Sequence, residues 1–134
     1  MKSASLGKIT IGQAIGECDL PLVDSIFENT KIKVKKMANM DSWLKTHAAF
    51  ILPLVNATYY TDGNLKSLKK ENTLINKLID AVQEGYEVIE AAGFSIVPYE
   101  EYEYVTTNRK KCYSFFRMMF ATFMGKNKYL CKTD

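Results

Sequence analysis

The spacing of apolar residues divides the chain into a strand–helix–strand segment and a longer helical part. Apolar and polar residues alternate over Lys8–Gly12 and again over Lys31–Lys36, which predicts two short strands. A helix starts between them at Asp19-Leu20-Pro21, and its apolar stripe is Leu22, Val23, Ile26 and Phe27. This order predicts a βαβ unit. Two strands alone do not make a stable sheet, so we expect the unit to be the edge of a larger one.

Every strong signal beyond Ala38 is helical. Asp41 is the predicted N-cap of a helix that extends to about Tyr60, with Pro53 kinking it rather than ending it because apolar periodicity resumes afterwards. Residues 61–64, Thr-Asp-Gly-Asn, predict a turn.

Two further helices are predicted. The first extends from about Glu71 to Ala92, with Gly93 as its C-cap, and its expected inward residues are Leu74, Ile75, Leu78, Ile79, Val82, Tyr86, Val88 and Ile89. The second, Cys112–Met124, is apolar nearly all round and carries only Arg117 as a charge. Such a helix is normally buried on several sides.

Length and charge narrow the class of protein. At 134 residues we expect one domain, or one domain with a fragment of another. The net charge of +3 is too small and the lysines are too dispersed for a nucleic-acid partner. The apolar run Ala48–Val55 is far shorter than the roughly 18 residues that cross a bilayer, so we expect no membrane span.

The cysteines favour a reducing compartment. Cys18, Cys112 and Cys131 are odd in number, widely spaced and contain no C-x-x-C pair. With one histidine, this spacing is not that of a zinc site, so we expect no metal. We interpret them as reduced, small buried side chains of a cytoplasmic protein.

Lys45 is the candidate with the clearest chemistry. It lies about one turn inside the helix that begins at Asp41, between Trp43 and Ala49, where the helix dipole mildly destabilises an ammonium. Two interpretations follow from this position. Lys45 is either a proton donor or anion anchor, or a lysine that lays its stem on apolar surface and its head in water.

Lys31, Lys33 and Lys35 lie on one face of the second predicted strand. They form either a phosphate-binding face or a charged edge that discourages strand-to-strand aggregation, and the second role is the commoner.

Several segments together resemble one family. They are Lys8–Gly12 (Lys-Ile-Thr-Ile-Gly), Phe27, Met40-Asp41-x-Trp43-Leu44-Lys45, Glu84 and Ala91-Ala92-Gly93. In this order they resemble the ketopantoate reductases, NADP-dependent enzymes of the pantothenate pathway that reduce a 2-keto acid to a 2-hydroxy acid.

The resemblance implies a mainly α fold. Residues 1–37 would be the terminal βαβ piece of a nucleotide-binding domain. Residues 38–134 would be a helical substrate and dimerisation domain of the 6-phosphogluconate-dehydrogenase C-terminal type. No G-x-G-x-x-G is present, so most of the NADP site would lie in a missing part and the cofactor-binding residues stay unknown. We therefore expect a fragment, truncated at both ends and inactive by itself.

The resemblance assigns three site residues. Lys45 matches the catalytic lysine, which protonates the carbonyl oxygen of the substrate. Asp134 stands near the family's substrate-binding glutamate and Thr122 near a serine that the family uses, so both are expected to bind substrate.

The chain departs from the family where substrate is held. The family usually places asparagines one and two turns after the lysine, and this chain has Ala49 and either Leu52 or Pro53 there. Asn56 lies roughly 16 Å along the helix from Lys45 at about 1.5 Å per residue, too far for one small ligand. The substrate within the 2-keto acid class therefore stays open. His47 points to another face, and we expect it to pack rather than to catalyse.

An alternative function is a non-enzymatic helical module that binds a partner through the apolar 112–124 helix. In either case we expect a homo-oligomer, because a sheet edge and an apolar helix would both be exposed.

Overall fold

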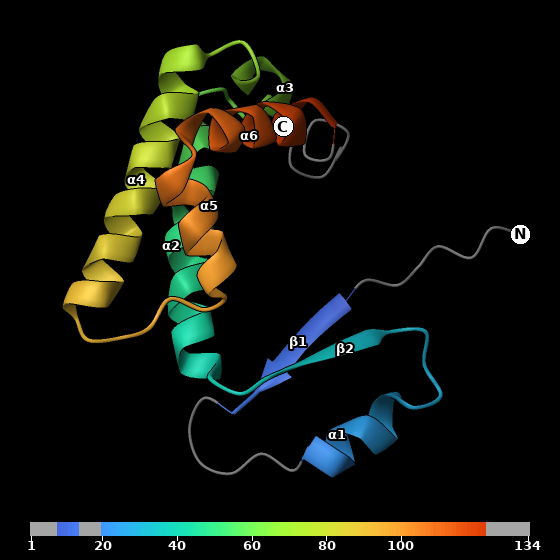
Figure 1. Cartoon of the computed structure of the whole chain (residues 1–134). Coiled ribbons are helices and arrows are strands. Elements are labelled where there is room, and N and C mark those ends of the chain that lie inside the picture. Colours follow the sequence, from blue (N-terminus) through green and yellow to red (C-terminus); the bar gives the residue numbers. More distant parts are fainter. Residues whose placement is uncertain (1–7, 14–19, 123–134) are drawn as a thin grey trace, which may run out of the picture. The chain divides into compact units, whose positions relative to one another are not determined.

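A computed structural model describes residues 8–13 and 20–122, and the chain separates into two compact units, Met1–Leu44 and Lys45–Asp134 (Figure 1). A two-stranded parallel sheet precedes a mainly helical part, which confirms the coarse fold class. The elements are β1 (Lys8–Gly12), α1 (Leu20–Phe27), β2 (Lys33–Met37), α2 (Met40–Tyr59), α3 (Leu65–Leu68), α4 (Asn72–Ala91), α5 (Tyr99–Thr107) and α6 (Arg109–Thr122). Within the described residues, no helix is both long and apolar enough to cross a membrane.

The two strands of the first unit run parallel, in a register from Lys8 opposite Lys33 to Gly12 opposite Met37. β1 has the bounds expected from the alternating pattern. A Cβ atom on Gly12 would lie 2.2 Å from the carbonyl oxygen of Met37. Glycine is therefore required at this position by the close approach of the two backbones.

The first unit lacks a buried core in its described part. No described residue of β1, α1 or β2 is buried, and Leu22 and Ile26 of α1 are 55% and 58% exposed. Lys36 and Asp24 form an ion pair on the surface, where such pairs contribute little stability. The strand pair therefore has very little apolar burial to stabilise it.

Helix α2 begins two residues earlier than the predicted cap implies, because its N-cap is Asn39 rather than Asp41. The Ser42 N–H donates to Asn39 Oδ1 at 3.1 Å. Asparagine caps a helix as well as aspartate does, and Asp41 then lies in the first turn, where the dipole favours a carboxylate. The helix continues through Pro53, as predicted.

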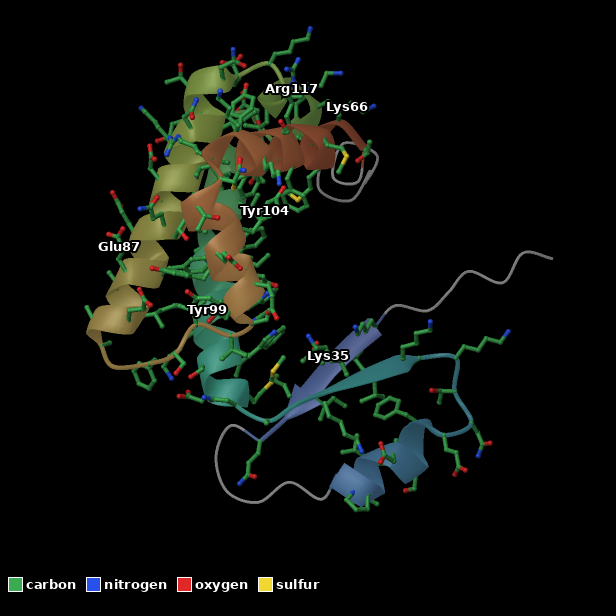
Figure 2. All side chains as sticks on the ribbon, viewed as in Figure 1. Lys35, Lys66, Glu87, Tyr99, Tyr104 and Arg117 are labelled. Carbon is green, nitrogen blue, oxygen red and sulfur yellow. The ribbon has the colours of Figure 1, made fainter. Side chains whose placement is uncertain are left out.

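Helix α4 supplies much of the core of the second unit, through its buried residues Ile75, Leu78, Ile79, Val82, Tyr86 and Ile89. The prediction that Val88 faces inward was wrong, because its side chain is 68% exposed. Val88 follows Tyr86 by two residues, which is about 200° around a helix and places it on the opposite face. Lys66, Glu87 and Arg117 also project from the outside of this unit (Figure 2).

Gly93 ends α4 in the predicted way. It adopts φ +83°, its N–H donates to the Glu90 carbonyl at 2.9 Å, and the Phe94 N–H donates to the Ile89 carbonyl at 3.1 Å. This pair of hydrogen bonds is a Schellman motif, in which the left-handed conformation favours glycine. The motif fixes the direction in which the chain leaves α4.

Helix α6 is less covered than its composition suggested. It starts at Arg109, earlier than the predicted Cys112, because Asn108 caps it by accepting the Lys111 N–H at 3.0 Å. Its buried residues Cys112, Phe116 and Phe120 pack inward, and the Phe116 ring stacks on Phe50 of α2 at a centroid distance of 5.7 Å. The opposite face leaves two apolar side chains exposed, Phe115 at 37% and Met118 at 59%.

Helices α2 and α4 approach each other closely at Ala49 and Gly85. A Cβ atom built on Gly85 would lie only 2.9 Å from the Cβ of Ala49. That atom is attached to backbone and cannot swing aside, as the end of a long side chain would. The helix crossing therefore depends on the absence of a side chain at Gly85.

We predict that Gly85→Ala destabilises the protein, although the same change in an open helix would stabilise it by about 1 kcal/mol. Overpacking typically costs about 1–3 kcal/mol, so the free energy of unfolding in urea should fall by about 1 kcal/mol. The matched control is Gly85→Ala in an Ala49→Gly background, where the second substitution should be stabilising. An increase in stability in both backgrounds would contradict the close contact.

Candidate functional site

Lys45 lies in α2 with its ammonium against an aromatic ring. Its Nζ atom is 4.1 Å from the centroid of the Phe94 ring, and its side chain is partly buried. At this distance the negative face of the ring attracts the cation. The side chain is therefore held by a specific contact and does not simply extend into water.

The segment that carries Phe94 is attached to α2 through Thr46. The Thr46 side chain is completely buried, and its Oγ1 accepts the Val97 N–H at 3.0 Å. With the turn at Gly93, this bond fixes both ends of the segment between α4 and α5. Sequence analysis missed Thr46, because one threonine in an apolar helix gives no signal of a contact 51 residues away.

The positions that follow Lys45 on its face of α2 do not form a polar substrate pocket. Ala49 is in contact with α4 at Gly85 and carries no polar group. Pro53 and exposed Asn56 line a separate groove of about 250 Å³ between α2 and α4. Where the family has asparagines, this face of α2 therefore packs against α4.

The two substrate residues suggested by the resemblance are not joined to Lys45 in the described structure. Thr122 is exposed at the last residue of α6, and its Oγ1 donates to the Met118 carbonyl of its own helix at 2.7 Å. Asp134 lies outside the described residues. Of the three residues that the resemblance assigns, Lys45 is therefore the one that the described structure holds against another segment of the chain.

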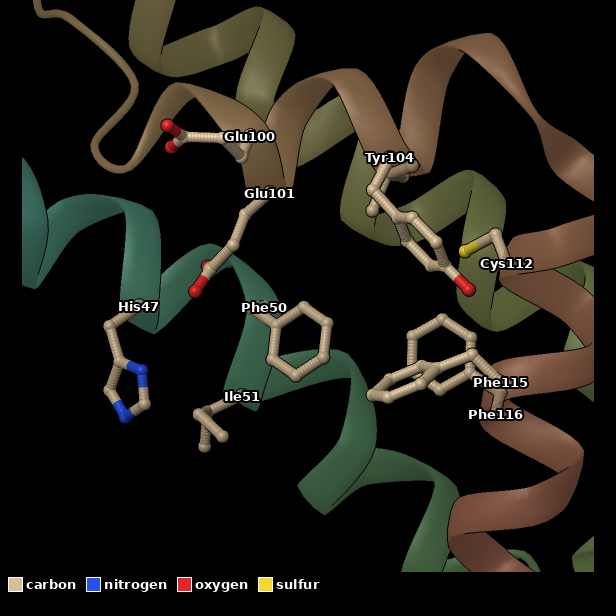
Figure 3. Close-up of a pocket in the computed structure, with 10 residues that line it drawn as sticks. His47, Phe50, Ile51, Glu100, Glu101, Tyr104, Cys112, Phe115 and Phe116 are labelled. Carbon is tan, nitrogen blue, oxygen red and sulfur yellow. The ribbon is translucent and has the colours of Figure 1, made fainter. Parts of the chain in front are cut away.

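A second candidate site is a cleft of about 540 Å³ formed by three helices of the second unit. Its lining side chains face a common space (Figure 3), and they are His47, Phe50 and Ile51 of α2, Glu100, Glu101, Tyr104 and Val105 of α5, and Cys112, Phe115 and Phe116 of α6. Neither Lys45 nor Thr122 is among them. His47, which we expected to pack, is exposed at the mouth of the cleft.

The cleft has one acidic end and an aromatic body. Glu100 and Glu101 lie in the first turn of α5, where the helix dipole favours carboxylates, and Glu101 extends towards the side of His47 and Phe50 (Figure 3). At the other end the Tyr104 hydroxyl donates to the Lys111 carbonyl at 3.0 Å, and its ring meets Phe115 edge-on at 5.9 Å. Phe115 in turn contacts Phe116 edge-on at 5.7 Å.

Two titratable groups in the described part of the second unit are buried, namely Cys112, which lines the cleft, and Tyr86, which does not. Burial raises the pKa of the Cys112 thiol to about 11, and the nearby Arg109 guanidinium offsets part of this increase. Burial, with smaller contributions from Glu101 and Cys112, also raises the pKa of Tyr86. The Tyr86 hydroxyl is fully buried and finds no hydrogen-bond partner among the described residues. Both groups are therefore held in their neutral forms.

Sequence analysis did not find the cleft, because its residues come from three helices that are remote in sequence. The usable signals were the charges in Tyr99-Glu100-Glu101 after Pro98 and the pair Phe115-Phe116. Neither indicates by itself which helices are neighbours. In the part of the chain that is described, no group of three or more His, Cys, Asp and Glu side chains could hold a metal ion.

We predict that Cys112 reacts slowly with iodoacetamide. A pKa about two units above that of an ordinary thiol lowers the thiolate fraction at pH 8 roughly 100-fold, and burial lowers the rate further. The rate should rise as pH approaches 11 and become ordinary in guanidinium. The measurement uses the Cys18→Ser/Cys131→Ser variant, so that mass spectrometry reports Cys112 alone. Labelling of the folded protein at the rate of a free thiol at pH 8 would show that Cys112 is accessible and ionised.

Comparison of the chain with models of known families, with curated proteins and with solved structures finds no match.

Proposed function

We propose that this chain is the C-terminal portion of an NADP-dependent 2-keto acid reductase that resembles ketopantoate reductase. Residues 1–37 would complete a nucleotide-binding sheet, and residues 38–134 would form a helical substrate and dimerisation domain of the dehydrogenase C-terminal type. The observation that carries the proposal is the parallel β1–β2 pair, which has no buried residue in its described part.

A parallel pair of two strands would be part of a larger sheet. Parallel sheets occur almost only where helices cover both faces, and two strands are too few to be stable. Leu22 and Ile26 of α1 are more than half exposed, so the helix that connects the strands also lacks a complete partner surface. Further strands beside this pair would bury those apolar side chains. The order βαβ followed by a helical domain is the order that the resemblance implies.

Lys45 supplies the chemistry. Reduction of a keto group builds negative charge on its oxygen, and an ammonium nearby both stabilises that charge and provides the proton. The ring of Phe94 under Nζ restricts the ammonium to one region, as catalysis of a proton transfer requires. The proton would pass from Lys45 Nζ to the substrate oxygen.

The described residues do not fit NADP by themselves. The glycine at the end of β1 does not open a cradle for a pyrophosphate, because the Met37 carbonyl oxygen occupies the space where a Cβ atom would lie. The described residues would therefore not hold the pyrophosphate of NADP at the end of β1. The NADP site would lie with the further strands of the sheet, in a cytoplasmic enzyme whose thiols are reduced.

The substrate would be held differently from ketopantoate. One turn after Lys45 the chain has Ala49, which packs against α4 at Gly85 and carries no polar group. Groups outside α2 would have to orient the carboxylate of the 2-keto acid. We therefore propose the reaction class, reduction of a 2-keto acid, and the role of Lys45 as proton donor. The pantothenate pathway is only the nearest analogy.

A second candidate function is a binding module without catalysis. Phe115 and Met118 on the outer face of α6 are exposed, as an interaction surface requires. A binding module does not need Lys45. Substitution of this lysine therefore distinguishes the two candidate functions.

We predict that Lys45→Ala in the complete reductase lowers kcat about 10²–10⁴-fold on the best 2-keto acid, because the proton donor is lost. The fold should remain, since an exposed cation–π contact is worth only about 0.5–1 kcal/mol. NADPH oxidation measured at saturating substrate gives kcat, and circular dichroism checks the fold. The control is Lys77→Ala on α4, another lysine on a helix of the same unit, which should keep the wild-type rate.

The chain of 134 residues alone should not oxidise NADPH with any 2-keto acid. A Lys45→Ala enzyme with unchanged kcat would refute the catalytic role and favour the binding module.

A further inference from the structure

The cleft continues into a second hollow, and together they form one surface along α5 and α6. The second hollow is lined by Tyr104, Lys110, Lys111, Ser114, Phe115 and Met118, so Tyr104 and Phe115 belong to both. We call this continuous region the α5–α6 surface. It lies entirely within the second unit.

The α5–α6 surface has opposite charges at its two ends. Glu100 and Glu101 occupy the first turn of α5, while Lys110 and Lys111 occupy the first turn of α6, after α5 has ended. All four side chains are exposed. Arg109, the remaining cation of that turn, is paired with Asp80 of α4 and does not add to the basic end.

The middle of the surface is apolar and aromatic. Tyr104 and Phe115 are 39% and 37% exposed, and Met118, one turn further along α6, is 59% exposed. The rings of Tyr104 and Phe115 are fixed, because the Tyr104 hydroxyl donates to the Lys111 carbonyl and the two rings pack edge-on. Rigid aromatic side chains in the centre and charged side chains at the rim are the composition of protein interfaces.

We propose that the α5–α6 surface is the interface between two copies of this chain. A two-fold axis through the Tyr104–Phe115 centre would place the acidic end of each copy against the basic end of the other. Such an isologous contact uses one patch twice and requires that patch to be self-complementary. A surface with two glutamates at one end and two lysines at the other meets this requirement.

Charge complementarity is what selects a second copy as the occupant. A partner with one sign of charge would be attracted at one end of the surface and repelled at the other. A second copy, related by a two-fold axis, is attracted at both ends. The proposal does not depend on reductase activity, because no residue of the surface is assigned to the reaction.

The test exchanges charges between the two ends. The acidic-end variant is Glu100→Lys/Glu101→Lys and the basic-end variant is Lys110→Glu/Lys111→Glu. Sedimentation equilibrium of the unmodified chain should give twice the 15.3 kDa of one chain. Each variant alone should dissociate at least about tenfold more readily, since every pair of ends then carries like charges. An equal mixture of the two variants should restore the unmodified affinity, because opposite charges meet again at both ends.

The matched control is Glu84→Lys/Glu87→Lys on the exposed part of α4, which changes the net charge equally and should leave the dimer unchanged. A second, uncharged test compares Met118→Asp with Val88→Asp, two exposed apolar positions at 59% and 68%. Only Met118→Asp should weaken the dimer, and circular dichroism verifies that each variant is folded.

A monomer at all concentrations up to several hundred micromolar would overturn the proposal. So would a dimer that survives both charge reversals and Met118→Asp, because association would then use another surface, such as the edge of the strand pair. Failure of the mixed variants to associate would exclude the two-fold arrangement.

Discussion

The close contact between α2 and α4 at Ala49 and Gly85 is the constraint on which the rest of the helical unit depends. It brings two 20-residue helices together with only the methyl group of Ala49 between their backbones at that point. From there α2 presents Lys45 to the ring of Phe94 and Thr46 to the Val97 amide, while its other side receives Phe116 of α6 against Phe50. Ala49, one turn after Lys45, therefore serves helix packing and offers no polar group to a substrate.

The two units differ in how they are stabilised. The second contains a continuous core that includes Tyr86, Phe116 and Phe120, each fully buried. The first has a parallel strand pair in which no described residue is buried. Apolar burial is the dominant favourable term in folding, and the described part of the strand pair has little of it. The reductase proposal names the rest of a nucleotide-binding sheet as the partner of this strand pair.

The spacing of apolar residues and the turn residues predicted several of the helices and strands. Nothing in the sequence indicated which of them are neighbours in space. β1, the end of α4 at Gly93 and the passage of α2 through Pro53 all followed from spacing and turn chemistry. The cap of α2 was assigned to the wrong polar residue, because Asn39 and Asp41 are equally good candidates by type. The cleft and the Thr46 contact depend on which helices are neighbours, and no periodicity within one helix carries that information.

Hydrogen exchange of the unmodified chain, followed by NMR, tests most directly whether the strand pair is an incomplete sheet. The amides of Ile79 and Val82 in the buried part of α4 should exchange only through global unfolding of the helical unit. The hydrogen-bonded amides of β1 and β2 should exchange at least about 100-fold faster, because their local opening costs little apolar burial. Equal protection of the strands and of α4 would show that the pair is stable as it stands. It would then remove the observation on which the reductase proposal is built.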